Sequence, residues 1–430
     1  MKVAVAHFRI GLTDGVSLQI EERVRILNDL GHDIVFIAGT SSPIADLRIP
    51  YFEYKTLNEI VSLQDQIFQN GIFPVGSLVE QIADEIGKKL DDFWQKEKFS
   101  HIFIHNIFSL PVCLPATLAF YNFLKNHPDL VGVAVHHDFW WDPARIKKFE
   151  VRSSKLEKFL ENYFPPELPN LTHTTISTWE RQELKKRRGI NSEVITDTYD
   201  FEQKAWIKNE SNKNFLKDVG LTGKELILLL ASRVRPRKGI EIGIEFTSLL
   251  KQTRKVVLLL PNDYSDMEKE YVEKLKRLAA DLNVDVCWIQ NWVGSEEEKK
   301  NGLKKYSLWD TYVFSDIVLY PSLWEGFGNQ FLEAVFAKKP IVVYEYEVFK
   351  TDIKKAGFQV ISLGDKYLIG ENGLAKISLA KYSAATRQTQ VLLSDKEKYN
   401  RMIEDNFAIG KRRFDTKSVL KKHLEKLLQT

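Results

Sequence analysis

Cysteine is nearly absent from this sequence of 430 residues. Only Cys113 and Cys287 occur, far apart and each within an apolar run. A disulfide scaffold or a cysteine-ligated zinc module needs several closely spaced thiols. Both classes of protein are therefore excluded.

An excess of charge of one sign is also missing. Lysine plus arginine number 61 against 58 aspartate plus glutamate, which leaves a net charge of +3. So small a surplus argues against a dedicated nucleic-acid or membrane-surface binder. The most basic run, residues 185–188, is followed by Gly189 and is typical of a helix C-terminus, where cations suit the negative end of the helix dipole. We expect no nucleic-acid partner and leave a peripheral membrane contact open.

Long hydrophobic runs are lacking as well. The longest apolar region, Ile102–Leu124, contains polar residues together with Pro111 and Pro115, so it cannot span a membrane. No secretory signal is recognisable, because the strand-like segment Val3–Ala6 begins at once. These absences predict a cytoplasmic protein.

The chain length predicts two or three domains of about 150 residues each. Short β-rich segments alternate with helical patterns, which is typical of parallel sheets built from βαβ units. The units form two unevenly spaced sets of about 200 residues, so we predict two doubly wound α/β domains rather than one eight-stranded barrel. Strands are expected at Val3–Phe8, Asp33–Ala38, His101–Ile107, Val131–His136, His173–Ser177, Glu193–Thr196, Leu226–Ala231, Lys255–Leu260, Val284–Ile289, Ile317–Tyr320, Ile341–Tyr344 and Gln359–Ser362.

The expected domain limits are residues 1–198 and 199–405. The polar stretch Asp197–Asp218 is the expected linker, and Ser41–Phe73 is expected to be irregular. The tail is strongly helical, and we expect residues 406–430 to cross back to the first domain.

Several motifs are missing. No Gly-x-Gly-x-x-Gly follows a strand, and the P-loop, His-Glu-x-x-His and Gly-x-Ser-x-Gly patterns do not occur. No two aspartates are spaced i, i+2, so the paired-aspartate cation site of many sugar-nucleotide enzymes is absent. We therefore predict no metal site.

A glycine-rich loop joins the apolar strand at 317–320 to a helix that starts near Asn329. Gly326 and Gly328 let the backbone approach a ligand closely, and the helix start offers free N–H groups. Glu325 in the loop and Glu333 on the helix could accept hydrogen bonds from the hydroxyls of a polyol. An N-cap glutamate plus an ordinary surface glutamate would explain the same spacing.

A basic segment at 233–238 follows another strand. Four cations, among them Arg233 and Lys238, occupy six positions where open α/β sheets bind ligands. Arginine offers a planar fork and lysine a point charge, which together suit a diphosphate. A solvated loop near an acidic partner is the alternative.

Two weaker features lie in the first half of the chain. Gly15 and Ser17 follow the first strand and would permit a phosphate approach and a helix cap. His137 ends another strand and could donate a hydrogen bond to a substrate, with Asp138 orienting it. Adjacent His136 competes for this role, and a purely structural histidine is equally compatible with the pattern.

In this order the features resemble family 4 of the retaining glycosyltransferases, which have the GT-B fold with two Rossmann-like domains facing across a cleft. Glu325 to Glu333 matches the Glu-x7-Glu motif of the family, and Arg233 with Lys238 matches its Arg-x4-Lys pair. The Thr13-Asp14-Gly15-Val16 turn lies where the family keeps a Gly-Gly loop, and His137 lies where it places a histidine near the donor sugar.

The resemblance implies a role for each matched residue. The first domain would bind the acceptor and the second the nucleotide sugar. Arg233 and Lys238 would neutralise the leaving diphosphate in place of a metal ion, and Glu333 would hold the ribose. The expected catalytic residues are His137, Arg233, Lys238 and Glu325, and the expected donor-binding residues are Gly15, Gly326, Phe327, Gly328, Asn329 and Glu333.

The implied activity is transfer of a hexose from a nucleoside-diphosphate sugar, UDP- or GDP-hexose, to an acceptor hydroxyl with retention of anomeric configuration and without a cofactor. The acceptor would be a small molecule, a glycan or a lipid-linked sugar. A sugar-nucleotide epimerase of the same fold is the nearest alternative. A non-catalytic nucleic-acid-binding protein is the alternative from another class.

Overall fold

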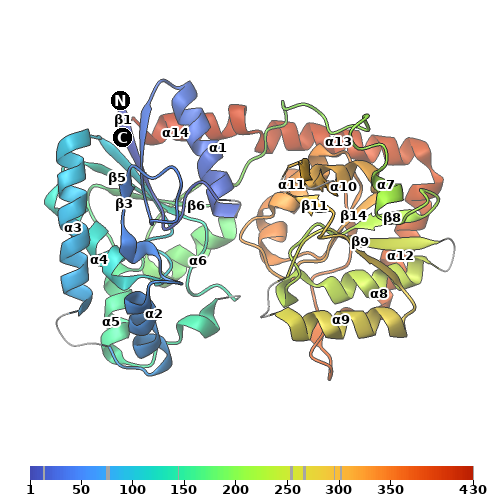
Figure 1. Ribbon diagram of the computed structural model, residues 1–430, viewed down its shortest axis with the longest axis horizontal. Coiled ribbons are helices and arrows are strands. Elements are labelled where there is room, and N and C mark those ends of the chain that lie inside the picture. The colour runs from blue at the N-terminus through green and yellow to red at the C-terminus, as the bar shows by residue number, and fades with distance from the viewer. Residues whose placement is uncertain are drawn as a thin grey trace. The chain divides into compact units, whose positions relative to one another are not determined.

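The computed structural model describes residues 1–12, 15–73, 78–143, 145–251, 255–264, 268–294, 296–300 and 303–429. The chain forms two compact units (Figure 1). One consists of Met1–Thr198 with Thr416–Thr430, and the other of Tyr199–Asp415. The boundary at Thr198 lies inside the stretch expected as a linker.

The first unit is built on a seven-stranded sheet with the order β3-β2-β1-β4-β5-β6-β7. All of its strand pairs are parallel. Its strands and α-helices are β1 (Lys2–Ala6), α1 (Gly15–Asp29), β2 (Asp33–Ala38), β3 (Leu47–Arg48), α2 (Asn58–Gln64), α3 (Leu78–Glu97), β4 (His101–His105), α4 (Leu114–Asn126), β5 (Val131–His136), α5 (Ser154–Tyr163), β6 (Leu171–Thr175), α6 (Thr178–Arg188), β7 (Glu193–Val194) and α14 (Lys421–Leu427).

Strand β1 shows why this sheet is covered on both faces. Successive side chains of a strand point to opposite faces. Val3 and Val5 pack into one core with residues of α1 and α14, whereas Ala4 and Ala6 pack into another with residues of α3 and α4. A continuous apolar strand therefore becomes the centre of a doubly wound unit, as predicted.

The second unit is built on a six-stranded parallel sheet with the order β10-β9-β8-β14-β15-β16. The predicted α/β class with two Rossmann-like domains is confirmed by these two sheets. The strands and α-helices of this unit are α7 (Phe215–Asp218), β8 (Leu226–Leu229), α8 (Ile240–Leu250), β9 (Val256–Leu260), α9 (Lys269–Asp281), β10 (Asp285–Trp288), β11 (Val293–Gly294), β12 (Glu298–Lys300), β13 (Leu303–Ser307), α10 (Leu308–Phe314), β14 (Ile317–Tyr320), α11 (Asn329–Phe336), β15 (Ile341–Val343), β16 (Ile361–Ser362), β17 (Leu368–Ile369), β18 (Ala375–Lys376), α12 (Leu379–Ser394) and α13 (Lys396–Phe414).

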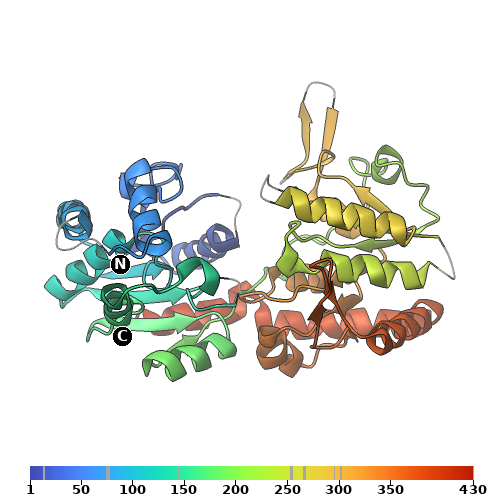
Figure 2. The ribbon, with the colours of Figure 1, turned by 90° about the horizontal axis from the view of Figure 1, so that it is seen from below.

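Two small sheets were not predicted. Strands β12 and β13 pair in antiparallel fashion and form a hairpin that projects from the second unit (Figure 2), and β11 pairs with β13. Strands β17 and β18 form a second antiparallel pair. The stretch Ser41–Phe73, expected to be irregular, contains β3 and α2.

Some strand ends differ from the expectation for a local reason. The strand predicted at His173–Ser177 is β6, which ends at Thr175. The hydroxyl of Ser177 accepts a hydrogen bond from the backbone N–H of Glu180 and so caps α6. An N-cap residue has extended backbone angles, as a strand residue does. A helix cap that directly follows a strand is therefore easily taken for the end of the strand.

The C-terminal segment returns to the first unit later than expected. Helix α13 stays within the second unit to Phe414, and the first unit resumes at Thr416. Helix α14 then lies against α1 (Figure 1 and Figure 2), with Leu420 and Leu424 in one core with Ile20.

Candidate active site

The basic segment and the glycine-rich loop meet in the second unit. They follow β8 and β14, which are adjacent parallel strands, so both lie at the same edge of the sheet. Gly239 has a φ of 60°, and a Cβ atom at this position would strike the backbone oxygen of Pro321. Only glycine permits this close contact between the two loops.

A second glycine fixes the loop before α11. Gly328 has a φ of 141°, and a Cβ atom there would collide with the hydroxyl of Tyr346. That hydroxyl donates a hydrogen bond to the backbone oxygen of Phe327 at 2.6 Å. The glycine-rich loop is therefore held by a tyrosine that the sequence did not single out.

Glu325 is a buried carboxylate held between two cations. The Lys238 ammonium donates to its Oε1, and Arg237 Nη1 donates to its Oε2 at 2.8 Å. Burial alone would raise the pKa of Glu325, but the charges of Lys238 and Arg237 outweigh burial and bring the pKa down to about 2. Glu325 is thus an anion at neutral pH, and Arg237 joins the site although sequence reasoning gave it no role.

Lys238 is almost entirely withdrawn from solvent, with 11% of its side chain exposed. Burial lowers the pKa of Lys238, and the charge of Glu325 opposes this effect. The negative charge of Glu333 also acts on Lys238. One cation therefore lies within electrostatic reach of both glutamates of the predicted motif.

Glu333 projects from α11 and is half-buried. Its Oε2 accepts a hydrogen bond from the Tyr312 hydroxyl at 2.7 Å. Burial raises the pKa of Glu333 to about 6, against the effects of Tyr312 and Lys238. At neutral pH the carboxylate retains acceptor sites that suit ligand hydroxyls.

The remaining predicted residues of the second unit differ in setting. Asn329 begins α11, and its Oδ1 is buried with no hydrogen-bond partner among the described residues. A buried acceptor without a donor is costly, so a ligand hydroxyl or amide would be favourable there. Phe327 is buried against Phe414, and Gly326 is half-buried. Arg233 is exposed, and the described part of the chain provides no partner for it.

His137 and Gly15 belong to the first unit. His137 follows β5, and its Nε2 lies 2.9 Å from Nδ1 of His105, with the two rings stacked. Asn106 accepts a hydrogen bond from the backbone N–H of His137 at 2.8 Å. Burial lowers the pKa of both histidines well below the usual value, so both rings are neutral. Gly15 is exposed at the start of α1, and Thr13 and Asp14 of the same turn lie outside the described residues.

The expected orientation of His137 by Asp138 is wrong. Asp138 forms an ion pair with Arg145 at 2.8 Å, and His105 is the ring partner of His137. The neighbouring His136 is separately engaged, with its Nε2 3.0 Å from Nδ1 of His173. The two adjacent histidines therefore belong to different hydrogen-bonded pairs.

Three buried acids follow strands of the first sheet. Asp142 comes after β5, Glu180 lies on α6 after β6, and Asp197 comes after β7. Asp142 accepts a hydrogen bond from the backbone N–H of Phe139 at 2.7 Å, and burial raises its pKa to about 8. Burial also raises the pKa of Asp197 to about 6 and that of Glu180 well above its usual value. Each of the three carboxyls has one buried oxygen without a partner among the described residues. Burial therefore shifts all three acids toward the protonated form, and with a pKa of about 8 Asp142 is mainly protonated at neutral pH.

This burial predicts a pH-dependent stability. The unfolded chain releases the Asp142 proton near pH 3.9, whereas the folded chain releases it near pH 8. Because the folded state binds more protons between these values, the contribution of Asp142 to the free energy of unfolding should fall by about 1.4 kcal/mol per pH unit. The Asp142→Asn variant cannot lose a proton, so its decline between pH 5 and pH 8 should be shallower in urea unfolding. Asp129→Asn, at an exposed site, is the control. Equal slopes for both variants and wild type would contradict a protonated Asp142.

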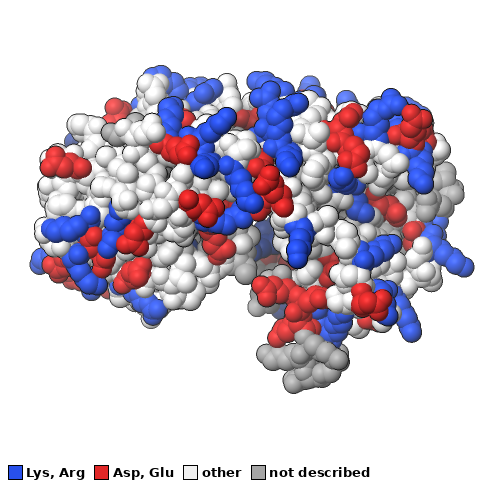
Figure 3. Space-filling view, turned by 90° about the horizontal axis from the view of Figure 1, so that it is seen from above, with Lys and Arg blue, Asp and Glu red and all other residues white. Residues whose placement is uncertain are grey.

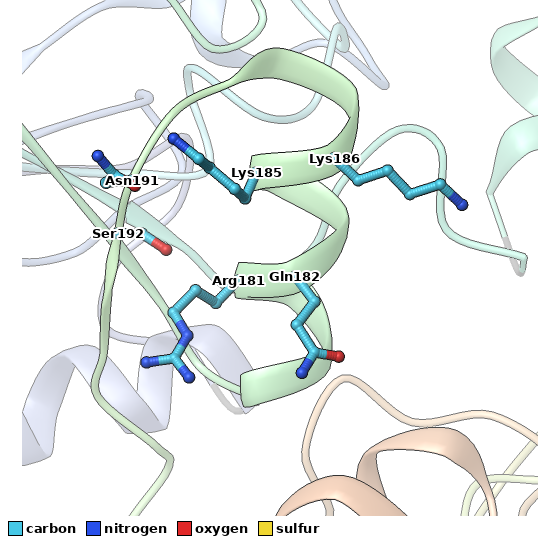
Figure 4. Close-up of a pocket in the computed structure, with 6 residues that line it drawn as sticks. All are labelled: Arg181, Gln182, Lys185, Lys186, Asn191 and Ser192. Atoms are coloured by element: carbon cyan, nitrogen blue, oxygen red, sulfur yellow. The ribbon is translucent and has the colours of Figure 1, made fainter.

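A surface pocket of about 560 Å³ lies elsewhere on the first unit (Figure 4). It opens between α6 and the segment that leads into the amino end of β7, and its lining is basic and polar. Ligands of open α/β sheets bind at the carboxyl ends of strands, so we do not assign this pocket to the reaction. Its lining residues are Arg181, Gln182, Lys185, Lys186, Asn191 and Ser192.

No group of three or more histidine, cysteine, aspartate or glutamate side chains in the described ranges could hold a metal ion. Within those same ranges, no helix is both long enough and apolar enough to cross a membrane.

Comparison with known proteins identifies the family of this architecture. A family model described as "Glycosyl transferases group 1" matches residues 211–407. The mannosylglucosylglycerate synthase of Thermotoga maritima is 34% identical over 438 aligned positions, which cover 96% of each chain. The synthase of the same name from Petrotoga mobilis is 30% identical and covers 97% of this chain and 99% of its own.

The fold comparison agrees. A crystal structure of Anabaena HepE in complex with UDP and glucose superposes over all of both chains with a TM-score of 0.62 at 15% identity. At this identity the likeness concerns the fold alone, and it confirms the predicted GT-B class.

Proposed function

Because this chain belongs to the group 1 glycosyl transferases, we propose that it moves a hexose from a nucleoside-diphosphate sugar to an acceptor hydroxyl with retention of anomeric configuration. The observation that carries this proposal is the Lys238–Glu325–Arg237 cluster at the carboxyl ends of β8 and β14. Fixed positive charge at this edge suits the diphosphate of a nucleotide sugar.

We further propose a mannosyl donor and a glucosylglycerate acceptor. Two relatives that match nearly the whole chain carry the name mannosylglucosylglycerate synthase, and 34% and 30% identity over such lengths favours the same reaction. The donor would be a UDP- or GDP-linked sugar. A small soluble acceptor requires no membrane attachment, and we retain a cytoplasmic location as part of this proposal.

The chemistry depends on charge that develops on the leaving group. As the anomeric C–O bond breaks, the bonding electrons pass to the diphosphate, and fixed cations stabilise that charge without reorganisation. Lys238 and Arg233 would contact the diphosphate in this scheme. The acceptor oxygen then attacks the face that the diphosphate leaves, and its proton passes to the departing phosphate oxygen, so no protein nucleophile is required.

The other predicted residues would bind and orient the donor. Glu325 and the backbone of 326–329 would hold the hexose, and the free Oδ1 of Asn329 could accept a hydrogen bond from one of its hydroxyls. Glu333 would hold the ribose. Neutral His137, held by His105, could donate one hydrogen bond to the donor sugar, and Gly15 would admit the phosphates.

One experiment tests this function directly. The purified protein is incubated with GDP-mannose, UDP-mannose, GDP-glucose or UDP-glucose, each with and without glucosylglycerate. Mass spectrometry detects the product, and NMR coupling constants give its anomeric configuration. A product of inverted configuration would contradict retention, and consumption of donor to an epimer without acceptor would favour the epimerase alternative.

The nucleic-acid alternative gains no support from the surface. On the face shown in Figure 3, basic and acidic residues are interspersed rather than separated. The near-balanced composition agrees with this distribution. An electrostatic footprint for nucleic acid requires clustered cations.

Metal independence is a separate prediction. In the proposed site, Arg233 and Lys238 carry the charge that a divalent ion supplies in other sugar-nucleotide enzymes. Initial rates of transfer should therefore be the same within error in EDTA and in Mg²⁺ or Mn²⁺. If EDTA abolished turnover and Mg²⁺ restored it, the proposed role of these cations would be wrong.

A further inference from the structure

Arg237 links the basic segment to the glycine-rich loop through several bonds. Its Nη1 lies 2.8 Å from both Glu325 Oε2 and the backbone oxygen of Trp324. Its own backbone oxygen accepts a hydrogen bond from the N–H of Leu323 at 2.8 Å. Three consecutive residues of the loop are therefore bonded to this single arginine.

The charges of the cluster give Arg237 a second consequence. Lys238 and Glu325 alone form a pair of zero net charge, which would contribute little to stabilising negative charge on a leaving group. With Arg237 on the other carboxylate oxygen, the three side chains together carry one positive charge. Arg237 thus offsets the negative charge of Glu325, so the positive charge of Lys238 is not cancelled.

We propose that Arg237 is a positioning residue for sugar transfer, which holds Glu325 by its second oxygen and leaves a net positive charge at Lys238 for the diphosphate. This inference rests on the proposed transferase function. The guanidinium group suits the task because it is always charged and its planar N–H groups can reach two acceptors at once. A lysine would supply the charge without the same geometry.

The alternative is that Arg237 only fastens the loop. A purely structural role would change the stability of the protein and leave the catalytic constants of the folded enzyme almost unaltered. A role through Glu325 would lower kcat and weaken nucleotide binding, because without Arg237 the cluster loses its net positive charge.

The test compares Arg237→Met with Arg235→Met, which removes the same charge from the same segment. Arg235 is exposed and lies 3.5 Å from Glu268 in an ion pair outside the cluster. For Arg237→Met we expect kcat at saturating donor to fall by at least about tenfold. Arg235→Met should stay within about twofold of wild type.

A third variant and a binding measurement complete the design. Arg237→Lys should fold and recover part of kcat, since it restores the charge. Calorimetry with UDP and GDP should show weaker binding to Arg237→Met than to Arg235→Met. If Arg237→Met and Arg237→Lys both match Arg235→Met in kcat and in nucleotide binding, the inference is overturned. An inactive, folded wild type with every donor and acceptor would instead contradict the proposed function itself.

Discussion

The Lys238→Met variant is expected to retain its fold and to lose a factor of about 10² to 10³ in kcat for sugar transfer. Methionine fills much of the space of the lysine side chain, so no cavity is created. Glu325 keeps its bond to Arg237, and Glu333 keeps its bond to Tyr312. The ammonium charge is the one feature that the substitution removes.

The size of the effect follows from where that charge lies. Lys238 is buried beside Glu325 at the loop edge of the sheet, where the low local dielectric strengthens its field. A preorganised charge next to a leaving group acts mainly in the transition state, so kcat should fall more than the KM for donor rises.

Lys339→Met is the matched control for burial. Lys339 is a half-buried lysine of the second unit, with a pKa lowered by burial to about 8, and its Nζ donates to the backbone oxygen of Ser315 at 2.7 Å. This control should lose stability and keep kcat. A loss of less than tenfold for Lys238→Met at saturating donor would exclude Lys238 as the leaving-group cation.

Much of the fold was predictable because its signals are local. Central strands such as β1, β8, β9 and β14 are apolar runs. Gly239 and Gly328 have positive φ angles, which glycine adopts most readily. The segments that carry Lys238 and Glu325 follow two adjacent parallel strands, and the roles of these residues stay predictions. Apolar patterns, glycine positions and the rules of parallel-sheet topology were therefore sufficient to predict the two sheets and their shared edge.

The contacts inside the site were not predictable for the opposite reason. Glu325 meets Lys238 across 87 residues and Arg237 across 88. His105 meets His137 across 32 residues, and its signal in the sequence is only a histidine at the end of a largely apolar strand. Asp138 was predicted to orient His137 because it is adjacent in sequence. Side chains of adjacent residues in an extended segment point in different directions, so adjacency did not bring the two together.

The short supplementary strands escaped prediction through their composition. Strand β3 has two residues, Leu47 and Arg48, and shows no alternation that a pattern could detect. Strands β12 and β13 are rich in lysine and glutamate, which strands ordinarily disfavour. Pairing of the backbone, rather than side-chain preference, defines these elements.

The Glu325→Gln variant is expected to be the least stable of the site variants. It leaves Lys238 buried without its anionic partner, and breaking one side of a buried ion pair costs about 3–5 kcal/mol. The reverse change, Lys238→Met, should cost less because Arg237 still pairs with Glu325. The structure thus predicts an asymmetry between the two halves of one ion pair.

The pH dependence of this loss identifies its cause. Without Glu325, burial should lower the pKa of Lys238 further below its usual value, so the folded state binds fewer protons there than the unfolded state. Stability then rises with pH from the lowered folded pKa up to the unfolded value near 10.4. In urea unfolding at pH 7 and pH 9, the deficit of Glu325→Gln relative to wild type should therefore shrink at the higher pH. A deficit that is constant with pH, or one no larger than that of Lys238→Met, would show that Glu325 is not the counter-ion on which the buried lysine depends.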